Sequence, residues 1–267
     1  MKVTILLLFL FPLISCSNKH KKENHQKIFV YQAAETPKID GLNSEACWDN
    51  TAWHALNENW SNTSYDSTDF NGRYKMIWNK KALYILIEIT DDVLYAPYTD
   101  PLNLWGNNDS VQLFIDEDNS GGLHHYNHNA FVYNIGLNGQ VLDLDTDKKP
   151  RFFNHVTSKR NTQGTLSTWE IEVKLYEEDF KKRRNYAPRV LHENKEIGFA
   201  LAYCDNDSSW QRENYIGSVF VPEDYNNQGW INADIFGTLI LKNSALENER
   251  LSEYMVVAKT NLLIPFM

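Results

Sequence analysis

Residues 104–122 read LWGNNDSVQLFIDEDNSGG, and this stretch decides the fold. Between Asp109 and Asp116 apolar side chains occupy one face of an alternating pattern, which is the period of a half-buried β-strand. The loop before this strand carries a bulky aromatic residue, Trp105, among small and polar neighbours. The segment after it combines Asn, Ser and Gly, which favour turns, with carboxylates of the kind that hold hard cations. One strand is therefore predicted to present an aromatic ring at one end and an acidic turn at the other.

Strand patterns recur along the chain, separated by turn residues. Residues 165–175 alternate strongly, and residues 197–203 are apolar on both faces, which predicts a central strand. The other expected strands are 28–34, 72–78, 82–89, 126–135, 140–146, 151–161, 215–221 and 236–241, with short helices at 44–53 and 176–184 and a polar loop at 60–71. Some ten strands with only short helical pieces predict an all-β protein, an antiparallel two-sheet β-sandwich of jelly-roll type with short peripheral helices.

The first residues have the composition of an export signal. Lys2 is followed by a short apolar run that ends at Leu13-Ile-Ser-Cys16, which resembles a bacterial lipoprotein cleavage box. We therefore expect a lipoprotein signal peptide at 1–15, a lipid on Cys16, and a cell-envelope protein, most simply at the outer membrane. A cleaved soluble export signal is the alternative. The remaining chain is expected to divide into a polar tether at 16–27, a β-sandwich domain at 28–242 and a tail of unknown role at 243–267.

Charge and cysteine content limit the classes of partner. The 267-residue chain has a formal net charge of −9, so it repels phosphate backbones and we expect no nucleic acid partner. A neutral glycan carries no such penalty. Besides Cys16 the chain contains Cys47 and Cys204, which either pair in an oxidising compartment or pack as buried free thiols.

Two motifs carry a family resemblance. The first is W-x(3)-D-S-V-x-L-F-I-D-E-x-N, beginning at Trp105, and the second is N-x-x-W-x(5)-F-G-x-L, running from Asn227 through Trp230 to Leu239. Together they resemble carbohydrate-binding module family 9, whose domains are β-sandwiches that hold a sugar between two tryptophans. The resemblance implies a mono- or oligosaccharide as ligand and assigns its ring faces to Trp105 and Trp230. Aromatic rings bury the flat C–H faces of sugars, and planar amides bond the hydroxyl rims.

The same resemblance assigns two polar positions. Asn227 matches an asparagine of the second motif, and Gln112 stands where the family carries a glutamate that bonds sugar hydroxyls. Glutamine both donates and accepts hydrogen bonds, so this exchange predicts binding with an altered preference. The family's strand arginine, expected around 132–134, has no counterpart in this sequence. Its absence bears on which sugar is bound more than on the fold.

Metal ligands are suggested at two places. The family carries structural calcium, so Asp116 and Asp118 in the turn are candidate ligands, with an ordinary acidic turn as the alternative. His124, His125 and His128 form a second group of metal-ligating residue type. On an extended segment His124 and His128 would lie ~13 Å apart, so we interpret these histidines as exposed side chains without a shared metal.

No catalytic motif is present in the sequence. It contains no nucleophile elbow, no H-E-x-x-H, no phosphate loop and no dinucleotide glycine pattern. A glycosidase needs two carboxylates across a sugar, and the pair Glu170 and Glu172 is expected on the solvated face of its strand. The sequence thus favours a non-catalytic carbohydrate-binding lipoprotein that captures glycan for uptake, with a glycosidase or a transporter as its partner. The alternatives are an envelope glycoside hydrolase and a sandwich that binds haem or a protein partner.

Overall fold

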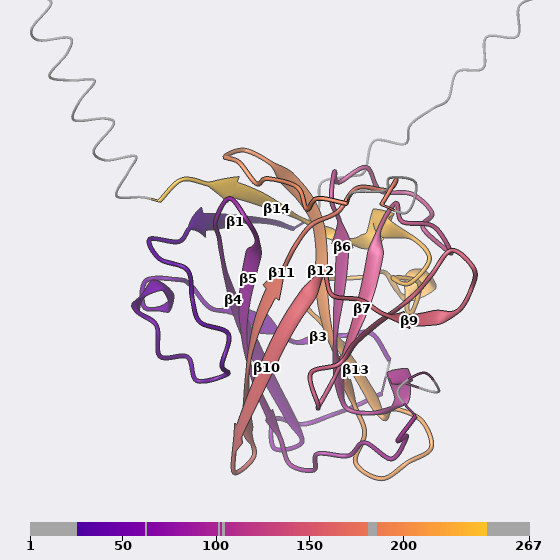
Figure 1. Cartoon of the computed structure of the whole chain (residues 1–267). Coiled ribbons are helices and arrows are strands. Elements are labelled where there is room, and N and C mark those ends of the chain that lie inside the picture. Colours follow the sequence, from indigo (N-terminus) through magenta and orange to yellow (C-terminus); the bar gives the residue numbers. More distant parts are fainter. Residues whose placement is uncertain (1–25, 62, 101, 103–104, 181–185, 245–267) are drawn as a thin grey trace, which may run out of the picture.

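The regular secondary structure of the protein is almost entirely β-strand (Figure 1). The computed structural model describes residues 26–61, 63–100, 102, 105–180 and 186–244. The expected signal peptide, Cys16, most of the tether and the tail from residue 245 onward lie outside these residues. The described strands are β1 (Lys27–Gln32), β2 (His54–Leu56), β3 (Glu58–Asn59), β4 (Phe70–Trp78), β5 (Leu83–Asp91), β6 (Ser110–Asp116), β7 (Phe131–Gly136), β8 (Val141–Leu144), β9 (Pro150–Phe152), β10 (Val156–Gln163), β11 (Leu166–Val173), β12 (Glu196–Asp205), β13 (Asn214–Gly217) and β14 (Gly237–Lys242).

The strands form one hydrogen-bonded path in the order β10-β11-β5-β4-β1-β14-β12-β6-β7-β8-β9. Its two halves lie face to face, because side chains of β4 contact side chains of β12, which is not a neighbour of β4 on the path. The ring of Phe70 stacks on Tyr203 with centroids 5.5 Å apart, and Tyr74 meets Phe199 at 6.2 Å. The predicted all-β sandwich is therefore confirmed.

The first strand departs from the expected antiparallel pairing. β1 runs parallel to both β4 and β14, and so joins the two halves of the sandwich. The other ladders between described strands are antiparallel. The sheet is accordingly mixed at this one position. No helix among the described residues has the length and apolar character needed to cross a membrane.

The strand β6 lies between β12 and β7 near the centre of one sheet. Val111, Leu113 and Ile115 point into the main core, as the alternation predicts. The opposite face is also covered, since Phe114 packs with Trp60 and Phe236 in a second apolar cluster. The prediction of a half-buried strand was wrong in this respect, because a second layer of loops covers the outer face.

Several other expectations need correction. The loop predicted at 60–71 is present over residues 60–69 where the structure describes them, but Trp60 within it is buried and its indole N–H donates to the Val219 carbonyl at 2.9 Å. Glu170 was expected on a solvated face, but it is fully buried, and its carboxylate accepts hydrogen bonds from Trp48 and from the backbone of Asp40 and Gly41. Both errors have one cause, namely that loops fold back over the outer faces of the sheets.

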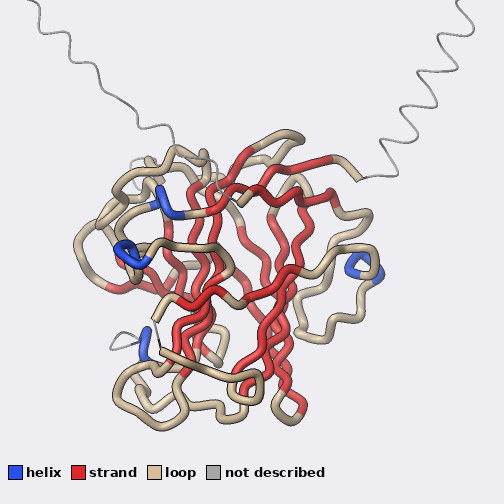
Figure 2. The backbone as a smooth tube through the Cα atoms, turned by 180° about the vertical axis from the view of Figure 1, so that it is seen from behind, coloured by secondary structure: helices blue, strands red, loops and turns tan. Residues whose placement is uncertain are grey.

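Helical structure is shorter than expected. The segment at 44–53 contains only the 3-10 turn η1 (Ala46–Trp48). Of the second predicted helix, at 176–184, residues 176–180 form loop and turn, and the remainder lies outside the described residues. The other described helical pieces are η2 (Trp105–Asn107), η3 (Glu223–Tyr225) and η4 (Ala233–Ile235). Figure 2 shows these short turns at the periphery of the strands. Cys47 and Cys204 are free thiols, and Cys204 is buried.

Candidate functional site

A pocket of about 300 Å³ lies over the outer face of β6, and we call it the β6 pocket. Trp105, Gln112, Asn227 and Trp230, the four residues suggested by the sequence motifs, all line it. The other lining residues are Gly106, His124, His125, Tyr126, Asn127, Ala130, Val132, Asp143, Leu144, Arg212 and Tyr215. The fold thus brings together two motifs that lie far apart in the sequence.

Trp105 reaches the pocket from η2, directly before β6. The turn is held from two sides. The amide of Asn134 in β7 donates to the Trp105 carbonyl at 3.4 Å, and the amide of Asn206 donates to the Asn107 carbonyl at 2.6 Å. Trp105 is partly exposed, so its ring is available on the pocket side without forming part of the core.

Trp230 lies on the segment between η3 and η4 and keeps 42% of its surface exposed. The His125 ring stands perpendicular to it with centroids 4.6 Å apart, which restricts the indole orientation. The preceding residue must be small, because a Cβ on Gly229 would lie 2.9 Å from the Phe114 ring of β6. The Trp230 loop therefore lies directly against β6.

Polar side chains in the pocket form a connected network. The Tyr215 hydroxyl donates to Gln112 Oε1 at 2.5 Å. The Arg212 guanidinium stacks on the Tyr215 ring, with Cζ 4.0 Å from its centroid. It also donates from Nη2 to Asn227 Oδ1 at 2.7 Å and from Nη1 to the Gly106 carbonyl at 3.3 Å. Each of the two loops that carry a pocket tryptophan is thus bonded to the same guanidinium.

Arg212 is the main pocket residue that sequence reasoning missed. It lies in the hairpin between β12 and β13, outside both motifs, and reaches the pocket because β12 pairs with β6. The sequence showed no arginine at 132–134, and Val132 and Asn134 indeed stand there on β7. A positive charge is nevertheless present in the pocket, because Arg212 reaches it from the hairpin between β12 and β13. Nothing in the local sequence around Arg212 indicates this role.

Asp143 is the one acidic residue among the described residues that line the pocket. Its carboxylate accepts hydrogen bonds from the backbone N–H of Val132 at 3.0 Å and of Leu144 at 2.6 Å. Burial raises the pKa of Asp143 well above its ordinary value, although both backbone bonds act in the opposite direction. The Asp143 carboxylate, which belongs to β8, therefore bonds β8 to β7 through the Val132 N–H.

The histidines before β7 do not behave as expected. His124 and His128 are buried, with 3% and 4% of their surfaces exposed, whereas His125 is exposed. The segment is a series of turns and not a strand, and it places His124 and His128 inside and His125 outside. His124 Nε2 lies 2.8 Å from the Gly229 carbonyl, and burial lowers its pKa to about 4. A neutral His124 ring thus supports the Trp230 loop.

The carboxylates of the turn after β6 accept hydrogen bonds from backbone N–H groups of the same turn. Asp116 accepts a hydrogen bond from the Gly121 backbone at 2.7 Å, and Asp118 accepts one from Ser120 at 3.1 Å. Three groups of acidic residues in the described parts of the chain have ligand atoms close enough to share a metal ion, and neither Asp116 nor Asp118 belongs to them. These hydrogen bonds stabilise the turn, and the role of Asp116 and Asp118 as calcium ligands stays a prediction.

Comparison with known proteins agrees with this architecture. Residues 39–244 match the model of the family described as "Carbohydrate family 9 binding domain-like". Two solved structures of a carbohydrate binding module family 9 from Caldicellulosiruptor kristjanssonii are similar to this chain, one in complex with cellotriose and one with glucose. Both are 21% identical and each covers 82% of this chain. The first has a TM-score of 0.64 over 95% of its own length, and the second 0.62 over 97%.

A curated relative is the Endo-1,4-beta-xylanase A of Thermoanaerobacterium saccharolyticum, which is 22% identical over 196 residues. The match covers 73% of this chain but only 14% of the xylanase, so the chain corresponds to a small part of that protein. The family model, in contrast, spans most of the described structure, including both tryptophan loops. This chain therefore belongs to the carbohydrate family 9 binding domain-like family.

Proposed function

We propose that this protein binds carbohydrate without changing it chemically, and that the sugar stacks between Trp105 and Trp230 in the β6 pocket. The observation that carries the proposal is the convergence of two loop tryptophans with Gln112, Asn227 and Arg212 on one pocket of about 300 Å³. This volume is at the small end of the range for ligand sites in proteins, about 300–1,000 Å³. It suits a short sugar or a chain end.

The side chains that line the β6 pocket favour a neutral, hydroxyl-rich ligand. Indole rings bury the C–H faces of a sugar, while the amide of Gln112 and the guanidinium of Arg212 offer donors directed at its hydroxyls. Because Tyr215 and Asn227 hold these two groups in place, little rotamer entropy is lost when a ligand binds.

The position of the carboxylates favours binding over hydrolysis. Two carboxyl groups about 5–10 Å apart are needed for either stereochemical course of glycoside hydrolysis. Among the described lining residues Asp143 is the single acid, and two backbone N–H groups already bond it. The proposed activity is accordingly capture of a glycan.

A titration of the purified protein with mono- and oligosaccharides, followed by calorimetry and tryptophan fluorescence, tests the proposal. The matched control is Trp210→Ala, because Trp210 is 85% exposed and lies outside the pocket. We expect Trp105→Ala and Trp230→Ala each to weaken binding at least tenfold and Trp210→Ala to leave it unchanged. Binding that survives both pocket substitutions in folded protein would show that the clamp is wrong. If no sugar of the panel binds, the alternatives gain support, namely a glycoside hydrolase or a sandwich that binds a protein partner.

We also propose that the protein is an envelope lipoprotein at the outer membrane. The composition of residues 1–15 and the position of Cys16 support this, with 16–27 as tether, 28–242 as binding domain and 243–267 as a tail without assigned role. A tethered module of this kind would supply sugar to a glycosidase or transporter for catabolism. Labelling cells with a fatty acid tests the anchor, since Cys16→Ser should abolish both the label and membrane recovery. A labelled Cys16→Ser protein would refute it.

A further inference from the structure

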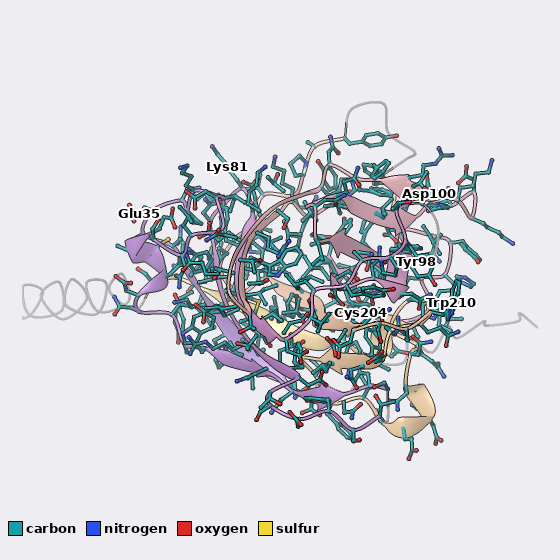
Figure 3. All side chains as sticks on the ribbon, turned by 90° about the horizontal axis from the view of Figure 1, so that it is seen from below. Glu35, Lys81, Tyr98, Asp100, Cys204 and Trp210 are labelled. Atoms are coloured by element: carbon teal, nitrogen blue, oxygen red, sulfur yellow. The ribbon has the colours of Figure 1, made fainter. Side chains whose placement is uncertain are left out.

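A second hollow, of about 710 Å³, lies beside β1, and we call it the β1 groove. It is lined by Phe29, Val30, Tyr31, Gln32, Ala33, Ala34, Ala46, Cys47, Asn50, Thr51, Ala52, His54, Met76, Ile77 and Ser244. None of these residues lines the β6 pocket. In Figure 3, Glu35, which directly follows the groove residue Ala34, lies on the opposite side of the molecule from Trp210. Trp210 belongs to the hairpin that carries Arg212, so the groove and the pocket are separate surfaces.

The groove follows a gap in the pairing of β4. This strand pairs with β2 as far as Tyr74 and with β1 from Ile77 onward, so two residues between them have no partner on that edge among the described strands. β1 pairs with β14 along most of its length but with β4 only at its last two residues, Tyr31 and Gln32. An unpaired stretch of strand edge is a place where a further chain segment can pack.

The lining of the groove is mostly apolar, and many of its side chains are small. Four of the lining residues are alanines, and small side chains leave room for larger ones to enter. Two large rings stand on the outward side of β1, where Phe29 keeps 53% and Tyr31 keeps 48% of its surface exposed. A concave apolar surface with exposed rings is typical of a site that another segment covers.

The end of the described chain lies at this groove. Ser244 is the last residue that the structure describes, and it is one of the lining residues. It follows β14, which runs parallel to β1 and ends beside it, with Lys242 paired to Tyr31 (Figure 1). The Lys242 ammonium also lies 5.7 Å from the centroid of the Phe29 ring. The residues that follow Ser244 therefore start at the groove.

The sequence after Ser244 contains an apolar stripe that fits such a groove. Apolar residues recur there at positions i, i+3, i+4 and i+7, which form one face of a helix: Leu251, Tyr254, Met255 and Ala258. Residues 245–250 connect Ser244 to this stripe and can span at most about 20 Å. The connection is thus long enough for the stripe to reach back onto the groove from Ser244.

We propose that residues 251–258 dock in the β1 groove of the same molecule, with the stripe facing the alanines and the rings of Phe29 and Tyr31. The docked segment fills the gap beside β4 and removes the two exposed rings from water. Because β1 joins the two halves of the sandwich, covering it stabilises the domain as a whole. Docking of the tail does not depend on the proposed sugar site.

Cys47 is a natural probe of the groove, because it lines the groove and its thiol is free, whereas Cys204 is buried. Burial raises the pKa of Cys47 to about 11, so its alkylation is slow and responds to any change in cover. The measurement is the rate of N-ethylmaleimide labelling of the purified protein carrying Cys16→Ser, followed by mass spectrometry.

We expect the double substitution Leu251→Asp with Met255→Asp to speed the labelling of Cys47 at least tenfold, because carboxylates do not enter an apolar groove. Val256→Asp is the matched control. It makes the same kind of change in the same segment, but its position lies outside the stripe on a helix. Its labelling rate should equal that of the unsubstituted protein.

Disulfide formation gives a second readout in variants that keep the tail apolar. Leu251→Cys, Tyr254→Cys, Met255→Cys and Ala258→Cys are oxidised one at a time at low protein concentration. At least one should form an intramolecular disulfide with Cys47, which requires Cα atoms less than about 7 Å apart. Ser252→Cys and Val256→Cys, on the other face, should not. Should the double aspartate variant be unfolded by circular dichroism, these cross-links decide alone.

Two results would overturn the docking. One is a folded double aspartate variant whose Cys47 is labelled no faster than in Val256→Asp. The other is the absence of an intramolecular disulfide at all four stripe positions. Disulfides that form only between molecules, with protection of Cys47 that rises with protein concentration, would show a second copy in the groove and would equally refute docking of the tail. Because the groove and the β6 pocket share no residue, sugar titration tests the proposed function independently.

Discussion

Arg212 Nη2 donates to Asn227 Oδ1 at 2.7 Å, and this bond joins the hairpin after β12 to the loop that carries Trp230. The same guanidinium bonds the Gly106 carbonyl beside Trp105. One side chain thus links both tryptophan loops. The residue that makes this link lies outside both motifs in the sequence.

Replacing Arg212 should therefore weaken sugar binding beyond the loss of one hydrogen bond. We expect Arg212→Gln to reduce affinity at least tenfold, corresponding to about 1.4 kcal/mol, because the tryptophan loops lose their common partner. Arg212→Lys should recover little, since an ammonium cannot reproduce the planar, multiply bonded arrangement. Calorimetric titration measures the effect, with surface Arg73→Gln as control. Equal affinity in Arg212→Gln and the unsubstituted protein would refute the linkage.

Gln112 offers a test of ligand preference. Glu at this position keeps the acceptor for the Tyr215 hydroxyl, removes the amide donor, and places a negative charge in the pocket with Arg212. We expect Gln112→Glu to remain folded and to change the ranking of sugars in the panel. Gln112→Leu should instead leave the Tyr215 hydroxyl unpaired and lower the free energy of unfolding by about 1–3 kcal/mol. Chemical denaturation measures the second effect, and an unchanged sugar ranking in Gln112→Glu would contradict the first.

The contact between β13 and Trp60 predicts a strong steric effect. A Cβ on Gly217 would lie 2.1–2.5 Å from atoms of the Trp60 indole, which is itself held by Val219. We expect Gly217→Ala to destabilise the fold by at least about 1–3 kcal/mol, the usual cost of overpacking. Gly106→Ala is the control, because the nearest atoms to its Cβ are 3.5 Å away. Thermal melts should show a clear loss for the first variant only.

The buried histidines predict acid sensitivity. Burial lowers the pKa of His124 to about 4 and of His155 to about 3, from an ordinary 6.5. Between these values the unfolded chain binds protons that the folded chain does not, so stability falls as the pH drops from 6.5 toward 4. His124 alone accounts for a change on the order of 3 kcal/mol. His124→Asn should flatten the pH profile of the melting temperature, whereas exposed His192→Asn should not; identical slopes would contradict this assignment.

The fold could be predicted largely because the apolar side chains that alternate along β6 and β11 do face the main core. Trp105 and Trp230 could be linked because each stands in a recognisable motif. What could not be predicted depends on loops that return across the sheets. Glu170 has the sequence pattern of an exposed residue, yet the loop at Asp40 and Gly41 covers it and provides its donors.

Arg212 illustrates the same limit within the site. It lies in a mostly polar hairpin, and it bonds two other connections, the turn at Gly106 and the loop at Asn227. Asp91 and Asp205, the last residues of β5 and β12, are likewise brought together only by the way the strands pack. A sequence pattern indicates which side chains of one strand face the core. Contacts such as those of Arg212 depend on how several strands and loops meet in space.

The parallel pairing of β1 with β14 places the first and last described strands side by side. The Thr238 N–H donates to the Gln26 carbonyl at 3.0 Å, so residues from opposite ends of the domain meet within one ladder. Until residues 237–242 have left the ribosome, β1 lacks one neighbour and β12 presents an open sheet edge. A nascent chain of this design cannot complete its sheet before residues 237–242 are available to pair with both neighbours.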